Sequence, residues 1–175
     1  MISDDEGLRE EYISREEIFK GRILHVVRDT VRLPDGKPAT REFCLHVGGV
    51  AVLPLLPDGR VIVERQVRYP LGRATIEIPA GKLNYAGEDR EEAARRELFE
   101  ESGAVEYEIK PLCDYWAGSE DGQSGACGVV FTVDIHRLGA LPESEMAETR
   151  RFERLPENMT YPEITAAIMA HWAKR

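Results

Sequence analysis

The chain has 175 residues, enough for one domain with a buried core, and 42% of them are hydrophobic. Its 32 acidic residues outnumber its 23 basic ones and give a net charge of −9, which argues against nucleic acid and anionic membranes as partners. The longest apolar run, 47–56, is too short to span a bilayer. The acidic start lacks the basic and apolar stretches of a secretory signal, and the three cysteines show no metal-binding spacing. We therefore expect a cytoplasmic protein with free thiols.

The first part of the chain is predicted to form strands. Residues 1–12 read as an acidic lead-in, and alternating apolar residues over 13–47 predict an extension of antiparallel strands. The sequence Leu-Pro-Asp-Gly at 33–36 supplies a turn inside this extension. Residues 48–175 are then expected to form the main domain.

The main domain is predicted to alternate strands with two helices. Strands are expected at 49–56, 61–66, 129–135 and 150–155. The clearest helix covers 89–102, with Asp89 as its cap, Glu92 completing a capping box, and Gly103 ending it. A second helix is expected from about 161 to 173. Strands on both sides of one well-marked helix predict an α+β sandwich.

The 89–102 helix concentrates acidic residues on one face. Glu97 and Glu101 are four residues apart, so their carboxylates leave the same face, and Glu100 borders it. Repulsion at this spacing costs roughly 0.2–0.5 kcal/mol per pair, and the helix dipole disfavours anions near this end. Bound cations would remove both penalties, and oxygen ligands suit Mg²⁺ or Mn²⁺ rather than zinc. The alternative is a solvated acidic face relieved by neighbouring arginines.

The residues around this helix resemble the Nudix hydrolase signature. From Gly81 the sequence runs GKLNYAGEDREEAARRELFEESGA. The matching positions are Gly81, Glu88, Arg96, Glu97, Leu98, Glu100, Glu101 and Gly103. Six residues separate Gly81 from Glu88 where the family usually has five, and the extra one falls in the turn at 84–87. Loops accept such insertions at small cost.

Three further segments, 46–54, 64–70 and 77–82, look like the ADP-ribose pyrophosphatase branch of that family. The resemblance implies a Nudix-type α/β/α sandwich with a mixed sheet, and metal-dependent hydrolysis of a nucleoside diphosphate derivative. It implies that metal is held by the Ala80 carbonyl, Glu97, Glu100 and Glu101. Arg96 would hold the glutamates by ion pairing, and Glu88 would be a structural or outer acid.

In the resembling enzymes a carboxylate from a loop after the signature takes the proton of the attacking water. Glu143, Glu145 and Glu148 are the candidates here, and Glu120 is an outlying one. We expect Glu145 or Glu148, because both precede the strand predicted at 150–155. For each residue the alternative is an exposed loop acid.

Arginine and aromatic side chains are the candidates for substrate contact. Arg68 suits bidentate contact with a diphosphate, and the alternative is a surface ion pair. Arg41 is a weaker candidate, for which an exposed strand arginine is the preferred interpretation. Trp116 or Tyr115 could stack on a base, with core or rim packing as the alternative.

The sequence leaves the substrate open. Members of the ADP-ribose branch usually carry a proline near the position of Gly118 and Ser119, and this chain has none there. ADP-ribose leads, with GDP- or UDP-sugars and dinucleotides such as NADH as alternatives. Two other function classes also stand as alternatives: a non-catalytic Nudix-like nucleotide sensor, and a structural or calcium-binding protein. The resemblance further implies a homodimer built through 13–47.

Overall fold

The computed structural model describes residues 7–118, 125–142, 148–153, 155–156, 159, 165–166 and 168–170, with the backbone alone described at 116–118, 125–126 and 148–150. The chain falls into two compact units, which divide between His46 and Val47. Each unit has its own sheet. No helix within the described ranges is both long and apolar enough to cross a membrane.

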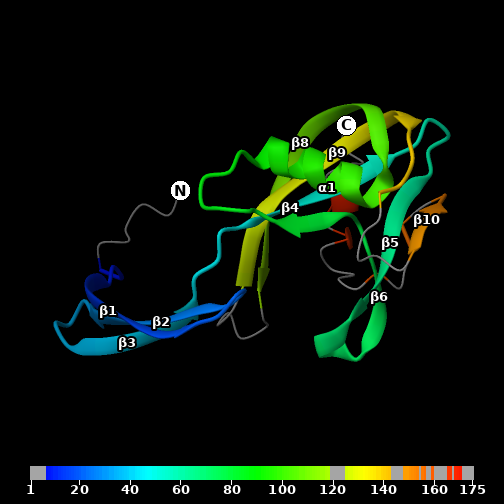
Figure 1. Ribbon diagram of the computed structural model, residues 1–175. Coiled ribbons are helices and arrows are strands. Elements are labelled where there is room, and N and C mark those ends of the chain that lie inside the picture. The colour runs from blue at the N-terminus through cyan, green and yellow to red at the C-terminus, as the bar shows by residue number, and fades with distance from the viewer. Residues whose placement is uncertain are drawn as a thin grey trace. The chain divides into compact units, whose positions relative to one another are not determined.

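The first unit is a three-stranded antiparallel sheet, as the sequence predicts. Its strands are β1 (Glu11–Lys20), β2 (His25–Arg32) and β3 (Pro38–Cys44), in the order β1-β2-β3. The turn after β2 forms at the predicted place, where the Gly36 N–H donates to the Leu33 carbonyl over 2.8 Å. Figure 1 shows the three strands side by side at the N-terminal end of the chain.

Rows of opposite charge cross this small sheet. Arg15 on β1 pairs with Asp29 on β2 through two hydrogen bonds of 2.6 and 2.7 Å. In the neighbouring row, Arg28 on β2 lies between Glu16 on β1 and Glu42 on β3 and bonds to both. Opposite charges facing each other across strands stabilise a sheet, so these charges are matched within the unit.

The second unit is built on a mixed sheet in the order β10-β5-β4-β9-β8. Its strands are β4 (Gly49–Leu55), β5 (Val61–Arg68), β6 (Arg73–Glu77), β7 (Ala80–Lys82), β8 (Ala104–Gly118), β9 (Gly125–Leu138) and β10 (Glu148–Phe152). The β4–β9 pair is parallel and the other pairs are antiparallel. A short 3₁₀ helix, η1 (Tyr69–Leu71), joins β5 to β6.

Strands β4 and β5 pair with each other at one end only. Their register contains one pair, Leu55 with Val61, after which β5 continues beside β6 and β4 beside β7. The segment from β6 to β7 therefore runs where β4 and β5 have separated. Its last residues, Ala80 to Lys82, lie opposite the start of β4.

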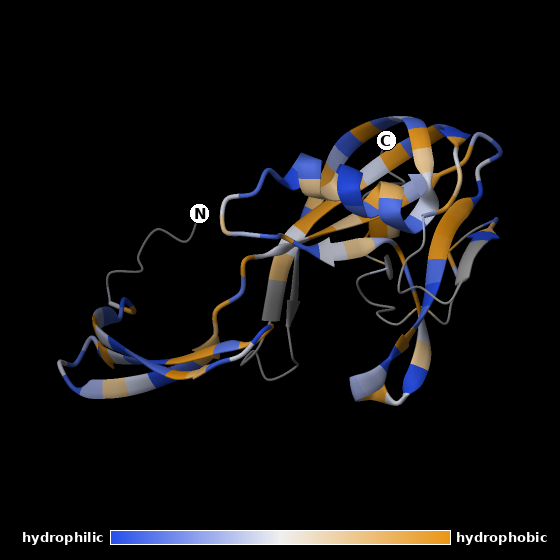
Figure 2. Ribbon diagram, in the orientation of Figure 1, coloured by the Kyte–Doolittle hydropathy of each residue, from blue (hydrophilic) through white to orange (hydrophobic). Residues whose placement is uncertain are grey.

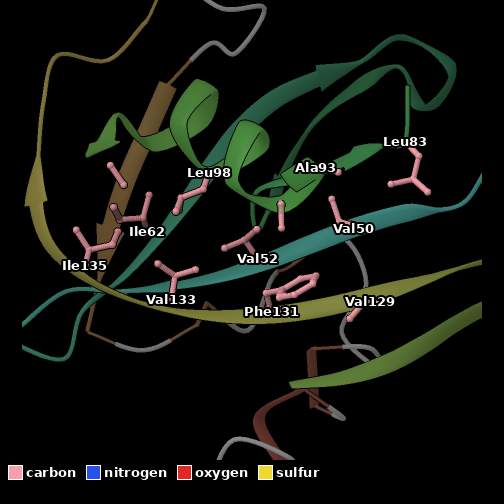
Figure 3. Close-up of a cluster of buried hydrophobic side chains, with 12 residues drawn as sticks. Val50, Val52, Ile62, Leu83, Ala93, Leu98, Val129, Phe131, Val133 and Ile135 are labelled. Atoms are coloured by element: carbon pink, nitrogen blue, oxygen red, sulfur yellow. The ribbon is translucent and has the colours of Figure 1, made fainter. Parts of the chain in front are cut away.

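The helix α1 (Arg90–Ser102) covers one face of this sheet. Leu98 and Ala93 on the helix belong to the same buried cluster as Val50 and Val52 on β4 and as Val129, Phe131, Val133 and Ile135 on β9. Figure 3 shows the side chains of α1 pointing toward those of the two strands. Leu98, Val52 and Val133 are fully inaccessible to solvent.

A second buried cluster packs on the other face. It contains Leu53 of β4, Val63 of β5 and, from the C-terminal part of the chain, Leu155, Met159 and Ile168. Residues 165–166 and 168–170 are helical, within the predicted second helix. A mixed sheet with helices and cores on two faces confirms the predicted α+β sandwich. Strands β6, β7 and β8 were not predicted.

Candidate active site

The α1 helix begins and ends where local sequence signals predict. The Asp89 Oδ1 accepts hydrogen bonds from the N–H groups of Glu91 and Glu92, each 2.9 Å long. At the other end Gly103 adopts φ 69° and donates its N–H to the Phe99 carbonyl, a left-handed cap that glycine adopts without strain. These caps set the register that carries Glu97 and Glu101 on one face.

The Glu97 side chain is buried against the backbone of β7. Only 7% of the residue is exposed. A Cβ atom added to Gly81 would lie 2.0 Å from the Glu97 carboxyl carbon, so this position requires glycine. Burial raises the pKa of Glu97, while the neighbouring Arg96 lowers it. Gly81 and Glu97, both residues of the signature, are therefore in direct contact, and the glutamate occupies the space that a larger residue at position 81 would fill.

Arg96 links two of the signature acids. Its Nη1 donates to Glu97 Oε1, and its Nη2 lies 3.5 Å from Glu88 Oε1 and 3.4 Å from the Lys82 carbonyl oxygen. Glu88 in turn accepts a 2.6 Å hydrogen bond from the Asn84 N–H. The arginine thus lies between Glu97 and the turn that precedes the helix.

Glu101 lies one helical turn beyond Glu97 and reaches the same stretch of backbone. Its Oε2 accepts a 3.1 Å hydrogen bond from the Ala80 N–H. Burial, followed by repulsion from Glu64 and Glu97, raises the pKa of Glu101 to about 9. The two predicted metal ligands therefore meet at the Ala80–Gly81 backbone.

The structure adds one acid that sequence reasoning missed. Glu64 on β5 is 2% exposed and is hydrogen-bonded to Glu101. Because side chains alternate along a strand, Glu64 lies on the face of Ile62, which belongs to the cluster under α1. The available signal was a glutamate directly after Val61-Ile62-Val63, at a position where the strand otherwise buries apolar residues.

Glu64 has a second acidic neighbour on its other side. Glu77 on β6 lies opposite Glu64 in the strand register. Burial raises the pKa of Glu64 to about 7, and repulsion from Glu77 adds to the shift, against the attraction of Arg68. Arg68 binds Glu77 through bonds of 3.2 and 2.6 Å. Figure 2 shows β5 changing from hydrophobic to hydrophilic along its length, toward the end that carries Arg68.

Two buried polar side-chain atoms have no hydrogen-bond partner within the described residues, and both belong to this site. They are Glu64 Oε2 and Arg96 Nε. Buried polar atoms are satisfied almost everywhere in native proteins, and exceptions call for a ligand, ion or water. The acids outnumber the two arginines, so the site has capacity for a bound cation.

The donors fit a hard divalent cation by their chemistry. Carboxylate oxygens without sulfur or imidazole suit Mg²⁺ or Mn²⁺. Across the described part of the chain, no three acidic, histidine or cysteine side chains stand in a ready-made ligand arrangement. Glu97 and Glu101, with the adjoining Ala80 backbone, are the groups that could hold the ion.

The other predicted site residues are distributed more widely. Glu100 is exposed on α1, and its charge raises the pKa of Glu97. Arg41 lies on β3 in the first unit and binds Glu10, the exposed strand arginine of the preferred interpretation. Tyr115 is half-buried in the second cluster, and for Trp116 the backbone pairs with Cys127.

The candidate general bases fall largely outside the described residues. Glu120, Glu143 and Glu145 lie outside them. For Glu148 the backbone is described, as the first residue of β10 and opposite Arg65 on β5. The strand predicted at 150–155 exists and begins at Glu148.

Comparison with protein families gives two matches. Residues 45–171 match the NUDIX domain model, and residues 10–43 match a model described as the nucleoside diphosphate sugar hydrolase N-terminal domain.

Individual relatives extend this result. An ADP-ribose pyrophosphatase of Bacillus subtilis (strain 168) is 45% identical over 110 residues, which are 63% of this chain and 59% of that protein. A methanol dehydrogenase activator of Bacillus methanolicus is 43% identical over 94 residues, 54% of this chain and 50% of that protein. The chain thus spans 50–59% of the length of these two relatives.

One solved structure, a crystal structure of an ADP compounds hydrolase, superposes with a TM-score of 0.71 at 16% identity and covers 95% of each chain. At this identity the likeness concerns the fold.

Proposed function

The chain belongs to the Nudix family, and from that premise we propose that it is a pyrophosphohydrolase that requires a divalent cation, Mg²⁺ or Mn²⁺. It would cleave the diphosphate linkage of ADP-ribose or a related nucleotide sugar, giving a nucleoside monophosphate and a sugar phosphate. The observation that carries the proposal is the meeting of the buried Glu97 and the half-buried Glu101 at the Ala80–Gly81 backbone.

The acidic residues of α1 and Arg96 have different roles at the cation site. Glu97 and Glu101 would hold the cation together with the Ala80 carbonyl, and Glu100 would assist from the exposed edge of α1. Arg96 keeps the Glu97 carboxylate in place from its position beside Glu88. When bound, a divalent cation neutralises phosphate oxygens and lowers the pKa of a bound water.

The diphosphate would be contacted by Arg68. Glu77 fixes the guanidinium of Arg68 by two hydrogen bonds, and 39% of the Arg68 side chain remains exposed. A fixed planar guanidinium suits bidentate contact with phosphate oxygens. Trp116 and Arg41 stay as further candidates for substrate contact.

The attacking water would lose its proton to a carboxylate that follows the signature. Glu148 and Glu145 are the candidates. The pairing of Glu148 with Arg65 supports the first, because it brings the start of β10 beside the strand that carries Glu64.

ADP-ribose is the leading substrate. The B. subtilis relative carries the name ADP-ribose pyrophosphatase, and the N-terminal match is to a domain of nucleoside diphosphate sugar hydrolases. Both support a substrate in which a diphosphate joins a nucleoside to a sugar.

The test measures nucleoside monophosphate released from ADP-ribose, GDP- and UDP-sugars, NADH and diadenosine polyphosphates, with Mg²⁺ and with chelator. We expect cation-dependent release of AMP and ribose phosphate from ADP-ribose. Glu101→Gln should remove turnover, while Glu92→Gln, an exposed change in the first turn of the same helix, should retain it. Cation binding without turnover of any substrate would contradict hydrolysis and favour a sensor.

We propose that residues 13–47 form an extension through which two chains dimerise. Residues 1–12 would be a lead-in, and residues 48–175 would be the hydrolase domain. Exposed apolar side chains on the strands of the first unit support dimerisation, including Tyr12, Ile18 and Phe19. Sedimentation of the protein should give twice the chain mass. Free thiols at Cys44, Cys113 and Cys127 support a cytoplasmic location.

A further inference from the structure

Glu64 occupies a place where the fold would ordinarily use an apolar residue. The three residues before it on β5 are buried valines and an isoleucine, and Glu64 itself is 2% exposed. Burying a carboxyl group costs several kcal/mol unless a partner compensates for the lost water. A purely structural position on this face would gain stability from an apolar side chain.

The neighbours of Glu64 supply little compensation. Its hydrogen bond to Glu101 joins it to another acid, and Glu77 faces it across the strand pair. Arg68, the cation whose charge attracts Glu64, is held by Glu77. One carboxyl oxygen, Oε2, has no hydrogen-bond partner in the described part of the chain.

We propose that Glu64, supplied by β5, is an additional carboxylate of the cation site formed by Glu97 and Glu101. The inference rests on the proposed cation requirement and adds a ligand-bearing element to it. Glu97 and Glu101 come from α1, whereas Glu64 approaches from the sheet beneath the helix. Carboxyl groups from two elements would then face the cation, and the unpartnered oxygen of Glu64 is the group available to it. Among the described residues the three acids do not stand in a ready-made ligand arrangement, so their side chains would turn toward the ion as it binds.

Glu64 acts in this arrangement through the ion and through Glu101. Without the ion, its hydrogen bond to Glu101 holds that carboxyl in place and requires one shared proton. A bound cation would displace this proton, and the charge of Glu64 would then add to the attraction for the cation. Loss of a group that supports metal ligands lowers affinity by about 10–100-fold. Glu64 is therefore expected to determine how tightly the cation binds.

The experiment measures Mn²⁺ affinity of the full chain by titration calorimetry and by electron paramagnetic resonance of free Mn²⁺, without substrate. Glu64→Gln keeps the size of the side chain and removes its charge. We expect its Mn²⁺ affinity to fall by about tenfold or more. The matched control is Asp134→Asn, which removes one charge from an exposed residue of β9 that pairs with Leu55 of β4. The control should bind Mn²⁺ as the unchanged protein does.

A second measurement separates lost binding from lost folding. Without metal, Glu64→Gln and Glu64→Val should unfold at or above the temperature of the unchanged protein, because each removes a buried acid. With Mn²⁺, both should show a smaller rise in unfolding temperature. If both variants fold and bind Mn²⁺ within twofold of the unchanged protein, Glu64 is no part of the site. If the unchanged protein binds no Mn²⁺, the cation requirement itself fails along with this inference.

Discussion

The two units of this chain treat charge in opposite ways. In the first unit, charged side chains stand in cross-strand rows where Arg15 meets Asp29 and Arg28 meets two glutamates, mostly at the surface. In the second, Glu64 and Glu97 are buried with Glu101 half-buried beside them, and burial together with repulsion from Glu97 raises the pKa of both Glu64 and Glu101. The ion pairs of the first unit stabilise its sheet. The acids of the second unit outnumber the arginines beside them, which indicates that a bound cation balances their charge.

The largest expected effect comes from removing a buried acid of the second unit. Glu97→Gln keeps the size of the side chain but removes the charge that Arg96 holds beside Gly81. Turnover of ADP-ribose with Mg²⁺ should fall by at least about 10³-fold, because several kcal/mol of charge stabilisation is lost. Steady-state kinetics measure the change, and circular dichroism checks the fold. Full activity in Glu97→Gln would leave the buried acids without a catalytic role.

The next largest effect is expected from disturbing the contact between Glu97 and the backbone at Gly81. In Gly81→Ala the new Cβ would fall 2.0 Å from the Glu97 carboxyl carbon, so the side chain must move. We expect a loss of about 1–3 kcal/mol in the free energy of unfolding, as for other overpacked sites, together with loss of turnover. Gly87→Ala is the control, since no atom lies within 4 Å of the added Cβ, although its φ of 90° adds local strain. Chemical denaturation measures both variants, and equal activity in the two would show that the contact is dispensable.

A smaller effect is expected from the matched charges of the first unit, and it depends on pH. The hydrogen bonds from Arg15 lower the pKa of Asp29. The ion pair therefore stabilises the fold fully above the unfolded pKa of about 4, and this contribution disappears as pH falls through the lower folded value. Between pH 6 and pH 2 the unfolding temperature should drop more for the unchanged protein than for Asp29→Asn. Parallel curves for the two proteins would contradict the assignment.

The smallest effect is expected from an exposed partner in the neighbouring row. Glu42→Gln removes the negative charge that faces Arg28 on β3, while Arg28 retains Glu16 as an acidic neighbour on β1. Surface ion pairs contribute little, so the unfolding temperature should change by no more than about 2 °C. Turnover of ADP-ribose should remain unchanged. A large loss of activity would mean that the first unit takes part in the reaction through this row.

Local signals made much of this arrangement predictable. Asp89 and Gly103 identify the ends of α1 by capping chemistry that depends on neighbouring residues alone. Once the helix is placed, the four-residue spacing puts Glu97 and Glu101 together. The turn at Leu33–Gly36 likewise fixes the hairpin of the first unit.

Contacts between distant residues were the part that could not be predicted. Strand β8 mixes polar and apolar residues without a clear period, and it is defined by its pairing with β9. Glu64 reads as an ordinary polar residue of a strand until the fold brings Glu101 over it, 37 positions later in the chain. Arg68 could be assigned to a surface ion pair in principle, but its partner Glu77 is fixed only by the pairing of β5 with β6.

The turn at 84–87 is closed by hydrogen bonds between the residues at its two ends. Glu88 accepts hydrogen bonds from both the main chain and the side chain of Asn84, so the two ends of the turn are joined to each other directly. Tyr85, at its tip, is 60% exposed. A peptide or fluorescent reporter inserted between Tyr85 and Ala86 would therefore leave the helix anchored, which makes this tip a practical attachment point for following substrate arrival optically.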